Sequence, residues 1–227
     1  MRTLWPRSVL KNTSKINLLT IVAFSDTHGE HENVTLPEGD LLVCCGDWTA
    51  RDSFEELPKF LSWLSDRPHK HKILVPGNHD FCFQSEAYKN MAKECGIHVL
   101  VHDEVMIEGL RFFGSSVQPE FMNWAFNYPP EERKRFWSNA PENVDVLVTH
   151  CPPKGILDKV KNSHLGCEYL AEYVGKLPKL KAHIFGHIHE GYGREDDGPA
   201  FVNCSLLNGN YDFVNKPMVV EVNARVG

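Results

Sequence analysis

Five short stretches of this chain place Asp, His or Asn directly after an apolar segment. They are Asp26-Thr27-His28, Gly46-Asp47, Gly77-Asn78-His79-Asp80, Thr149-His150 and Gly186-His187-Ile188-His189. One such stretch is weak evidence, because a lone His or a Gly-Asp pair is common in turns. All five in one chain favour a shared site, since oxygen donors mixed with imidazole nitrogens suit divalent Mn, Fe and Zn.

The spacing inside these stretches fits metal binding. Asp26 and His28 are separated by one residue, as are His187 and His189, so each pair can point to the same side of an extended segment. The glycines of three stretches let the backbone turn sharply and approach another segment closely. Two metals roughly 3.5–4 Å apart need a shared ligand, which an Asp can provide. The sequence therefore predicts a dinuclear metal centre.

The elements that position these residues are apolar strands. Strands are expected over residues 18–25, 40–45, 73–75, 144–149 and 182–185, and each ends at one of the five stretches. Helical spacing predicts helices over 54–64, 85–95, 129–137 and 166–174, and further strands are expected over 97–101, 104–107, 110–114, 201–204 and 218–222. This alternation predicts an α/β layered fold with mixed sheet pairing, in which ligands gather at strand ends.

The series DxH, GD, GNHD, H and GHxH resembles the calcineurin-like metallophosphoesterase superfamily across Asp26 to His189. The stretches FSDTHG, GDWT, THCPP and GHIHEGYG are similar to the brain metallophosphoesterase-domain-containing subgroup, which resembles class III cyclic nucleotide phosphodiesterases. The resemblance implies a four-layer α-β-β-α sandwich of two mixed β-sheets. It also implies a phosphoester hydrolase, a phosphodiesterase more than a monoesterase, that acts on small substrates such as cyclic nucleotides.

The same resemblance assigns roles to individual residues. It implies that Asp26, His28 and His189 hold one metal, that Asn78, His150 and His187 hold the other, and that Asp47 bridges them. The metals would be Mn, Fe or Zn, with Mn favoured, and a hydroxide bridging them would attack phosphorus in line. His79 would be a general acid or charge donor beside the phosphate, and Asp80 would orient the His79 ring.

Two rival functions stay open at this point. Protein serine/threonine phosphatases carry GDxxDRG and GNHE, whereas this chain reads GDWTARD and GNHD, so the Arg that grips phosphate is not at its expected position. A non-enzymatic scaffold would be expected to lose ligands or the catalytic His, and here all of them are present.

Several residues near the stretches have two interpretations. Cys151 follows His150 where relatives carry Gly, so its thiol either narrows the pocket and is sensitive to oxidation, or points into the core. The aromatic-rich loop 121–128 either stacks a nucleobase or aryl group or packs on itself. Trp48 either lines the cleft or packs inside, and His183 is interpreted as structural.

Composition limits the class of protein. The 227 residues predict one domain over 18–227 after a lead-in over 1–17, and the net charge of −6 without a basic block predicts no strong nucleic-acid binding. No apolar run approaches the ~20 residues of a membrane span. Seven cysteines without a CxxC pair indicate a reducing compartment. We therefore expect a cytoplasmic location, with a mitochondrial one as the alternative because residues 1–15 hold basic but no acidic residues. The expected partner is a small phosphoester, and oligomeric state is not predicted.

Overall fold

The computed structural model describes residues 16–50, 54–196 and 198–225. The predicted lead-in over 1–17 lies outside the described residues up to position 15, as do Arg51 and Asp52 of the GDWTARD stretch. The first strand begins at Ile16, two residues before the expected start. In the part of the chain described here, no helix is both long and apolar enough to cross a membrane.

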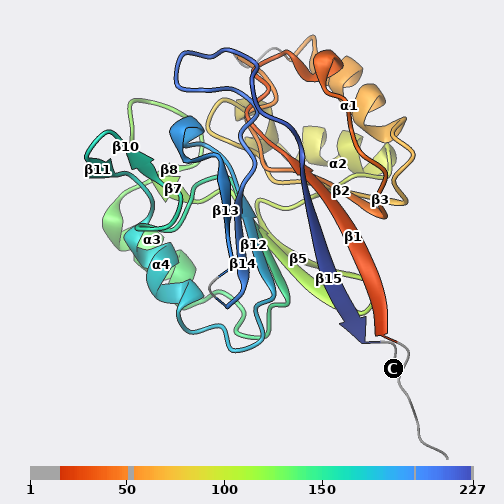
Figure 1. The fold of residues 1–227 in the computed structure, drawn as a ribbon. Helices are drawn as coiled ribbons and strands as arrows, with labels where there is room; N and C mark the ends of the chain where they lie inside the picture. The colour runs from red at the N-terminus through yellow and green to blue at the C-terminus, as the bar shows by residue number, and fades with distance from the viewer. Residues whose placement is uncertain (1–15, 51–53, 197, 226–227) are drawn as a thin grey trace, which may run out of the picture.

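The first sheet has the strand order β15-β1-β2-β3-β4. Its strands are β1 (Ile16–Phe24), β2 (Leu41–Cys44), β3 (His71–Leu74), β4 (His98–Val99) and β15 (Met218–Arg225). Strands β1 to β4 run parallel, and β15 runs antiparallel along β1 with the register Ile16↔Arg225 to Ala23↔Met218. Figure 1 shows these two long strands side by side, so the two ends of the described chain are joined in one sheet.

The second sheet has the order β13-β14-β12-β9-β6-β5. Its strands are β5 (His102–Ile107), β6 (Leu110–Ser115), β9 (Val146–Thr149), β12 (Ala182–Phe185), β13 (Gly193–Glu195) and β14 (Ala200–Asn203). The four inner strands are parallel and the two edge strands antiparallel. A tight turn joins β5 and β6, with φ values of 49° at Glu108 and 76° at Gly109.

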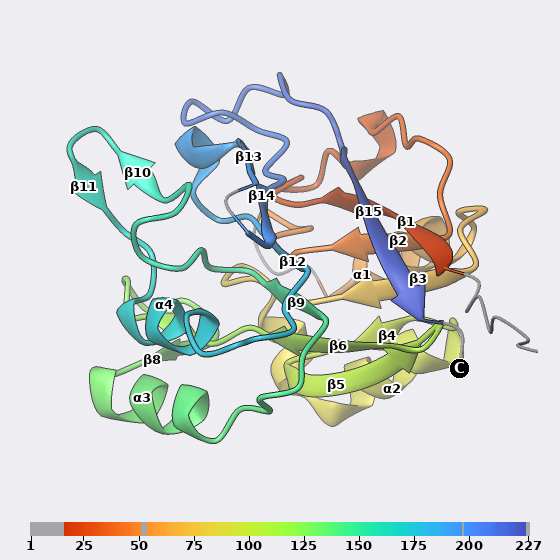
Figure 2. The ribbon, with the colours of Figure 1, turned by 60° about the horizontal axis from the view of Figure 1, so that its bottom comes forward.

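The two sheets pack face to face because their strands alternate between two apolar environments. In β1, Ile21 and Ala23 face the core between the sheets, whereas Val22 and Phe24 face the helices α1 (Leu57–Ser65) and α2 (Glu86–Glu94). The helices α3 (Pro130–Ser138) and α4 (Glu168–Val174) cover the outer face of the second sheet through a third cluster that includes Leu147 of β9. Figures 1 and 2 show the resulting layers. The predicted four-layer α-β-β-α sandwich is confirmed.

Helix α1 illustrates how the sequence forms these elements. Leu57, Phe60, Leu61 and Leu64 are buried at the i, i+3, i+4, i+7 spacing of one helical face. The helix begins at Leu57 and not at Phe54, because Pro58 favours the first helical turn and residues 54–56 form a turn.

Seven short elements, in addition to the three-residue strand β13, were not expected from the sequence. They are the 3-10 helices η1 (His31–Asn33), η2 (Phe81–Gln84) and η3 (His189–Gly191), and the two-residue strands β7 (Gln118–Pro119), β8 (Asn127–Tyr128), β10 (Lys159–Val160) and β11 (Ser163–His164). Elements of two to four residues are too short to show a periodic pattern. Three of them, β7, β8 and η3, lie in loops that reach the site described next.

Candidate metal centre

The five polar stretches meet where parallel strands of the two sheets end. Those after β1, β2 and β3 come from the first sheet, and those after β9 and β12 come from the second. The loops are joined across the sheets: the His187 backbone N–H donates to Asp26 Oδ2 at 3.0 Å, and Ser25 pairs with Ser205 as an isolated bridge. The strand ends thus bring together side chains that are up to 163 residues apart in the sequence, Asp26 and His189.

Four of the predicted ligands have left-handed backbone conformations, which non-glycine residues seldom adopt. Their φ values are 55° at Asp26, 42° at His28, 51° at Asp47 and 69° at His187. Such strain is typically kept where surrounding structure enforces it and function requires it. It turns each chain sharply after its strand, so the side chain is held at the strand end.

Two glycines are required by close approach. A Cβ on Gly77 would lie 2.2 Å from Asp47 Oδ1, and a Cβ on Gly186 would lie 2.4 Å from Asp26 Oδ2. The predicted role of these glycines, close backbone approach, is therefore confirmed at both positions.

One group of potential ligand atoms consists of Asp26, His28 and His189. His189 Nε2 lies 3.7 Å from Asp26 Oδ1, and the Ser205 hydroxyl donates to Asp26 Oδ2 at 2.7 Å. The buried Nε2 of His28 has no hydrogen-bond partner among the described residues. A buried ring nitrogen without a partner costs free energy, and a metal ion would satisfy it.

A second group consists of Asp47, His150 and His187. His150 Nε2 lies 3.4 Å from Asp47 Oδ2 and 3.0 Å from Asn78 Oδ1, so the amide of Asn78 joins this group. Asp47 Oδ2 also lies 3.9 Å from His28 Nε2 in the first group. Asp47 is thus the carboxylate that contacts both groups.

Three imidazoles are oriented in the same way. His150 Nδ1 pairs with the Cys45 carbonyl at 2.7 Å, and His189 Nδ1 pairs with the Asn208 carbonyl at 3.0 Å. His79 Nδ1 pairs with the Ala50 carbonyl at 2.9 Å. Because a carbonyl can only accept, each Nδ1 carries the proton, and each Nε2 is presented to the centre.

Electrostatics hold the two carboxylates ionised. Burial alone would raise the pKa of Asp26, but His189, which hydrogen-bonds and attracts it, and also His150 and His28 hold that pKa far below its usual range. Burial likewise opposes ionisation of Asp47, and attraction and hydrogen bonding from His150 outweigh it, so its pKa is also lowered.

The imidazoles separate into two kinds. Burial lowers the pKa of His150 and His189, but Asp47 and Asp26 respectively outweigh it and raise each to about 9. Burial lowers the pKa of His187 to about 4 and also lowers that of His28. The donor set consists of two carboxylates, the Asn78 amide and four imidazoles, and these ligand types fit two divalent cations.

Comparison with known proteins identifies the family of this chain. The profile of the calcineurin-like phosphoesterase family matches residues 19–191. Metallophosphoesterase domain-containing protein 1 of Homo sapiens is 35% identical over 88% of this chain and 70% of that protein. The chain belongs to the calcineurin-like phosphoesterase family. Members of this family are metal-dependent phosphoesterases with a dinuclear divalent-metal centre.

More distant similarities extend over much of the chain. A probable glycerophosphodiester phosphodiesterase from Arcobacter nitrofigilis is 28% identical over 70% of this chain and 60% of that protein. The crystal structure of a phosphopantetheinyl hydrolase from Mycobacterium tuberculosis superposes with a TM-score of 0.58 at 18% identity, covering 89% of this chain and 95% of that one. The structural match supports the calcineurin-like fold.

Asp80 of this phosphoesterase does not occupy the expected place. Its carboxylate does not contact the His79 ring: Oδ2 accepts the backbone N–H of Gly77 at 2.7 Å and of Asp47 at 2.8 Å. The prediction that Asp80 orients His79 is therefore wrong, and the Ala50 carbonyl holds that ring instead. The physical reason is direction, since the Asp80 side chain is fully buried beneath the loop, whereas the His79 ring lies in the cavity wall.

A cavity of about 600 Å³ opens above the two ligand groups. His79 lies in the wall of this cavity. The centroid of the His79 ring is 4.0 Å from the ring centroid of Trp124 and 4.7 Å from that of His28. Tyr211, which the sequence did not indicate, packs 5.1 Å from His28 and 5.0 Å from His189. The sequence signal that could have indicated Tyr211 is the preceding Asn208-Gly209-Asn210 turn. This turn lies in the loop after β14, and the other site residues also lie in loops that follow strands.

Each of the two interpretations of the aromatic loop 121–128 holds for some of its residues. Phe121 and Trp124 line the cavity, whereas Phe126 is buried under the first sheet and Tyr128 packs against Phe136 of α3. Trp48 is buried and stacks on Phe60 at 4.5 Å, so it packs inside and does not line the cleft.

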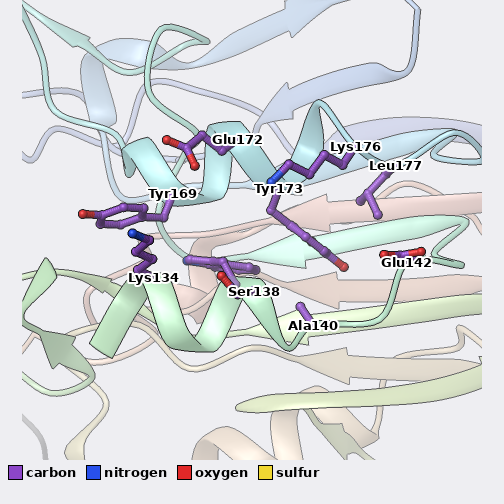
Figure 3. A pocket seen from close by; sticks show the side chains of 10 residues that line it. Lys134, Ser138, Ala140, Glu142, Tyr169, Glu172, Tyr173, Lys176 and Leu177 are labelled. Carbon is purple, nitrogen blue, oxygen red and sulfur yellow. The ribbon is translucent and has the colours of Figure 1, made fainter. Parts of the chain in front are cut away.

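A smaller cavity of about 260 Å³ lies between α3 and α4 (Figure 3). Figure 3 shows Lys134 beneath the ring of Tyr169, with Glu172 nearby on the same helix as Tyr169. None of the predicted site residues lines this cavity. Its lining residues lie in positions 134–142 and 169–177, and none of them also lines the cavity of the metal centre.

Cys151 points away from the metal centre. Its side chain is 1% exposed and belongs to the apolar cluster under α3 and α4, and burial raises its pKa well above the usual thiol value. The structure therefore favours the inert core interpretation over the oxidation-sensitive one. His183 is fully buried, with its Nε2 2.8 Å from the Thr149 hydroxyl, which confirms a structural role.

Proposed function

We propose that this phosphoesterase hydrolyses small phosphodiesters, cyclic nucleotides among them, with two divalent metal ions. One group of ligands is Asp26, His28 and His189, the other is Asn78, His150 and His187, and Asp47 is shared. The observation that carries the proposal is the position of Asp47 Oδ2, 3.9 Å from His28 Nε2 and 3.4 Å from His150 Nε2. Mn is the favoured metal and Fe or Zn the alternatives, because the donors are carboxylate, amide and imidazole.

The bound metals supply Lewis acidity, which neutralises phosphate oxygens and lowers the pKa of water. The chain supplies the rest. His79 has its Nδ1–H committed to Ala50, so a proton carried on Nε2 can be given to the departing ester oxygen. The His79 backbone N–H donates to Asp47 Oδ1 at 2.9 Å, which fixes His79 relative to the shared carboxylate.

Two observations favour a diester over a monoester. Two aromatic rings of the cavity wall lie beside different imidazoles, Trp124 beside His79 and Tyr211 beside His28, so each substituent of a diester can contact an aromatic ring. The similar protein from Arcobacter is named for glycerophosphodiester hydrolysis. A reducing cytoplasmic location belongs to the same proposal, because the sequence has seven cysteines, an odd number, and no CxxC pair.

The test is a substrate panel with defined metal content. Purified protein is stripped with a chelator, reloaded with Mn, Zn or Fe, and assayed on an aryl phosphodiester, the matching aryl monoester and cyclic nucleotides. We expect metal-dependent hydrolysis with higher kcat/KM for the diester. A higher value for the monoester would identify a monoesterase, and two bound metals with no hydrolysis of any substrate would identify a scaffold.

A further inference from the structure

The mouth of the metal-centre cavity is apolar. Ten large apolar side chains of the described chain are well exposed, and four of them line this cavity. They are Phe121 at 62%, Met122 at 73%, Leu165 at 49% and Tyr211 at 60% exposure. Single exposed apolar residues need no explanation, but a cluster around a cavity marks a surface that is covered when a ligand binds.

These side chains come from three loops that are separate in the sequence. Phe121 and Met122 lie between β7 and β8, Leu165 follows β11, and Tyr211 lies between β14 and β15. The 118–128 loop reaches the GNHD stretch, where the Ala125 backbone N–H donates to the Asn78 carbonyl at 3.0 Å. Residues that are distant in the chain thus form one apolar rim around the proposed metal ligands.

Hydrogen bonds hold two of these loops in place, so the exposure of their apolar side chains is a built feature. The Asn127 amide donates to the Phe121 carbonyl at 2.7 Å, and Gln118 Nε2 donates to the Ala125 carbonyl at 3.2 Å. In the second loop, the buried carboxylate of Asp158 accepts the backbone N–H groups on both sides of the segment that carries Leu165, from Gly155 at 3.0 Å and Gly166 at 2.9 Å. Rigid apolar groups bind an apolar ligand with little ordering cost.

The size and charge of the cavity narrow the ligand further. A volume of about 600 Å³ fits a drug-sized molecule and is far larger than a phosphate with two small esters needs. Of the described residues that line it, Glu120 is the charged one outside the metal centre and none is Lys or Arg. The rim therefore offers apolar contact and little to a second anionic group.

We propose that the preferred substrates are phosphodiesters that carry one large, uncharged apolar group, aryl or alkyl, which the Phe121–Met122–Leu165–Tyr211 rim covers. This inference rests on the proposed diesterase function and specifies its substrate class. A fully buried methylene contributes about a fourfold gain in binding. That gain is shared by ground state and transition state, so it is visible in kcat/KM.

The test keeps the leaving group constant and varies the other ester group. The metal-loaded protein is assayed on p-nitrophenyl phosphodiesters whose second group is methyl, hexyl, 3,3-dimethylbutyl or its charged isostere 2-(trimethylammonio)ethyl. We expect kcat/KM to be roughly tenfold or more higher for hexyl than for methyl, since only part of the chain is buried. We also expect the neutral dimethylbutyl ester to exceed the trimethylammonium ester.

Exposed rim positions supply the variants. Phe121→Ser and Met122→Ser should each reduce the hexyl-to-methyl ratio. Met106→Ser changes a methionine on β5 that is 58% exposed and lies outside the cavity, so it should leave the ratio unchanged. Equal kcat/KM for methyl and hexyl, or a better trimethylammonium ester, would overturn the apolar substrate class while the diesterase function stands. Failure to hydrolyse any of the four esters with both metals bound would overturn the diesterase function as well.

Discussion

Asp80 provides a direct test of how Asp47, the proposed bridging ligand, is held. Its Oδ2 accepts the backbone N–H groups of Gly77 and Asp47, and its side chain is fully buried. Asp80→Ala leaves both donors buried without an acceptor, and each such loss costs about 1–3 kcal/mol, or roughly 2–6 kcal/mol together. Burial and the charge of Asp47 raise the pKa of Asp80, so removal of this carboxyl relieves part of the cost and the loss should fall in the lower half of that range.

Asp80→Asn separates this role from the orientation of His79. The amide oxygen can still accept both N–H groups, so Asp80→Asn should lose less free energy of unfolding in urea than Asp80→Ala, although its NH2 group replaces Oδ1, which is buried without a hydrogen-bond partner. Asp158→Ala is a matched control, because Asp158 also accepts two backbone N–H groups while buried, and it should lose stability without losing metal. The reasoning is refuted if Asp80→Asn keeps its stability and metal but shows the leaving-group dependence of a His79 variant.

Four further predictions address the centre and the core behind it. Asp47→Ala should lower bound metal, measured by elemental analysis, more than His28→Ala does, and two equivalents still bound would exclude bridging. His79→Ala should keep both metals and lower turnover by ~10²–10⁴, with a smaller loss for nitrophenyl esters, whose leaving group needs little protonation; an equal loss for all leaving groups would leave only an electrostatic role. Cys151→Gly should cost about 1–2 kcal/mol of stability and inactivate in peroxide at the parent's rate, because the thiol is buried in the core; a protected variant would contradict that placement. Burial lowers the pKa of His183 from 6.5 to about 3, so unfolding takes up a proton between these pH values and the free energy of unfolding falls as the pH falls. In His183→Leu the dependence of this free energy on pH should be shallower by up to about 1.4 kcal/mol per pH unit. An unchanged pH dependence would refute the placement of a neutral, buried imidazole at position 183.

The α/β fold class and the residues that gather at the centre could be predicted before the structure was known. Apolar strands specify where the chain runs through a core, and the residue after each strand lies at a sheet edge whatever the loop does next. Asp26, Asp47 and His187 could therefore be assigned to one site, because each follows its own strand and the resemblance assigned them ligand roles. The buried faces of the helices could also be predicted from local sequence, because the spacing from Leu57 to Leu64 is that of one helical face.

The groups that hold those residues, and the groups that surround them, became visible only in the folded chain. Ser205 donates to Asp26 across 179 positions, and the His79 ring pairs with the Ala50 carbonyl across 29. Asp80 was assigned to its sequence neighbour His79, but its carboxylate turned to backbone groups beneath the loop. Hydrogen-bond partners depend on which loops meet and in which direction each side chain leaves the backbone. A local pattern encodes neither, so the orientation of the imidazoles and the apolar rim that includes Tyr211 emerged only when both sheets were packed together.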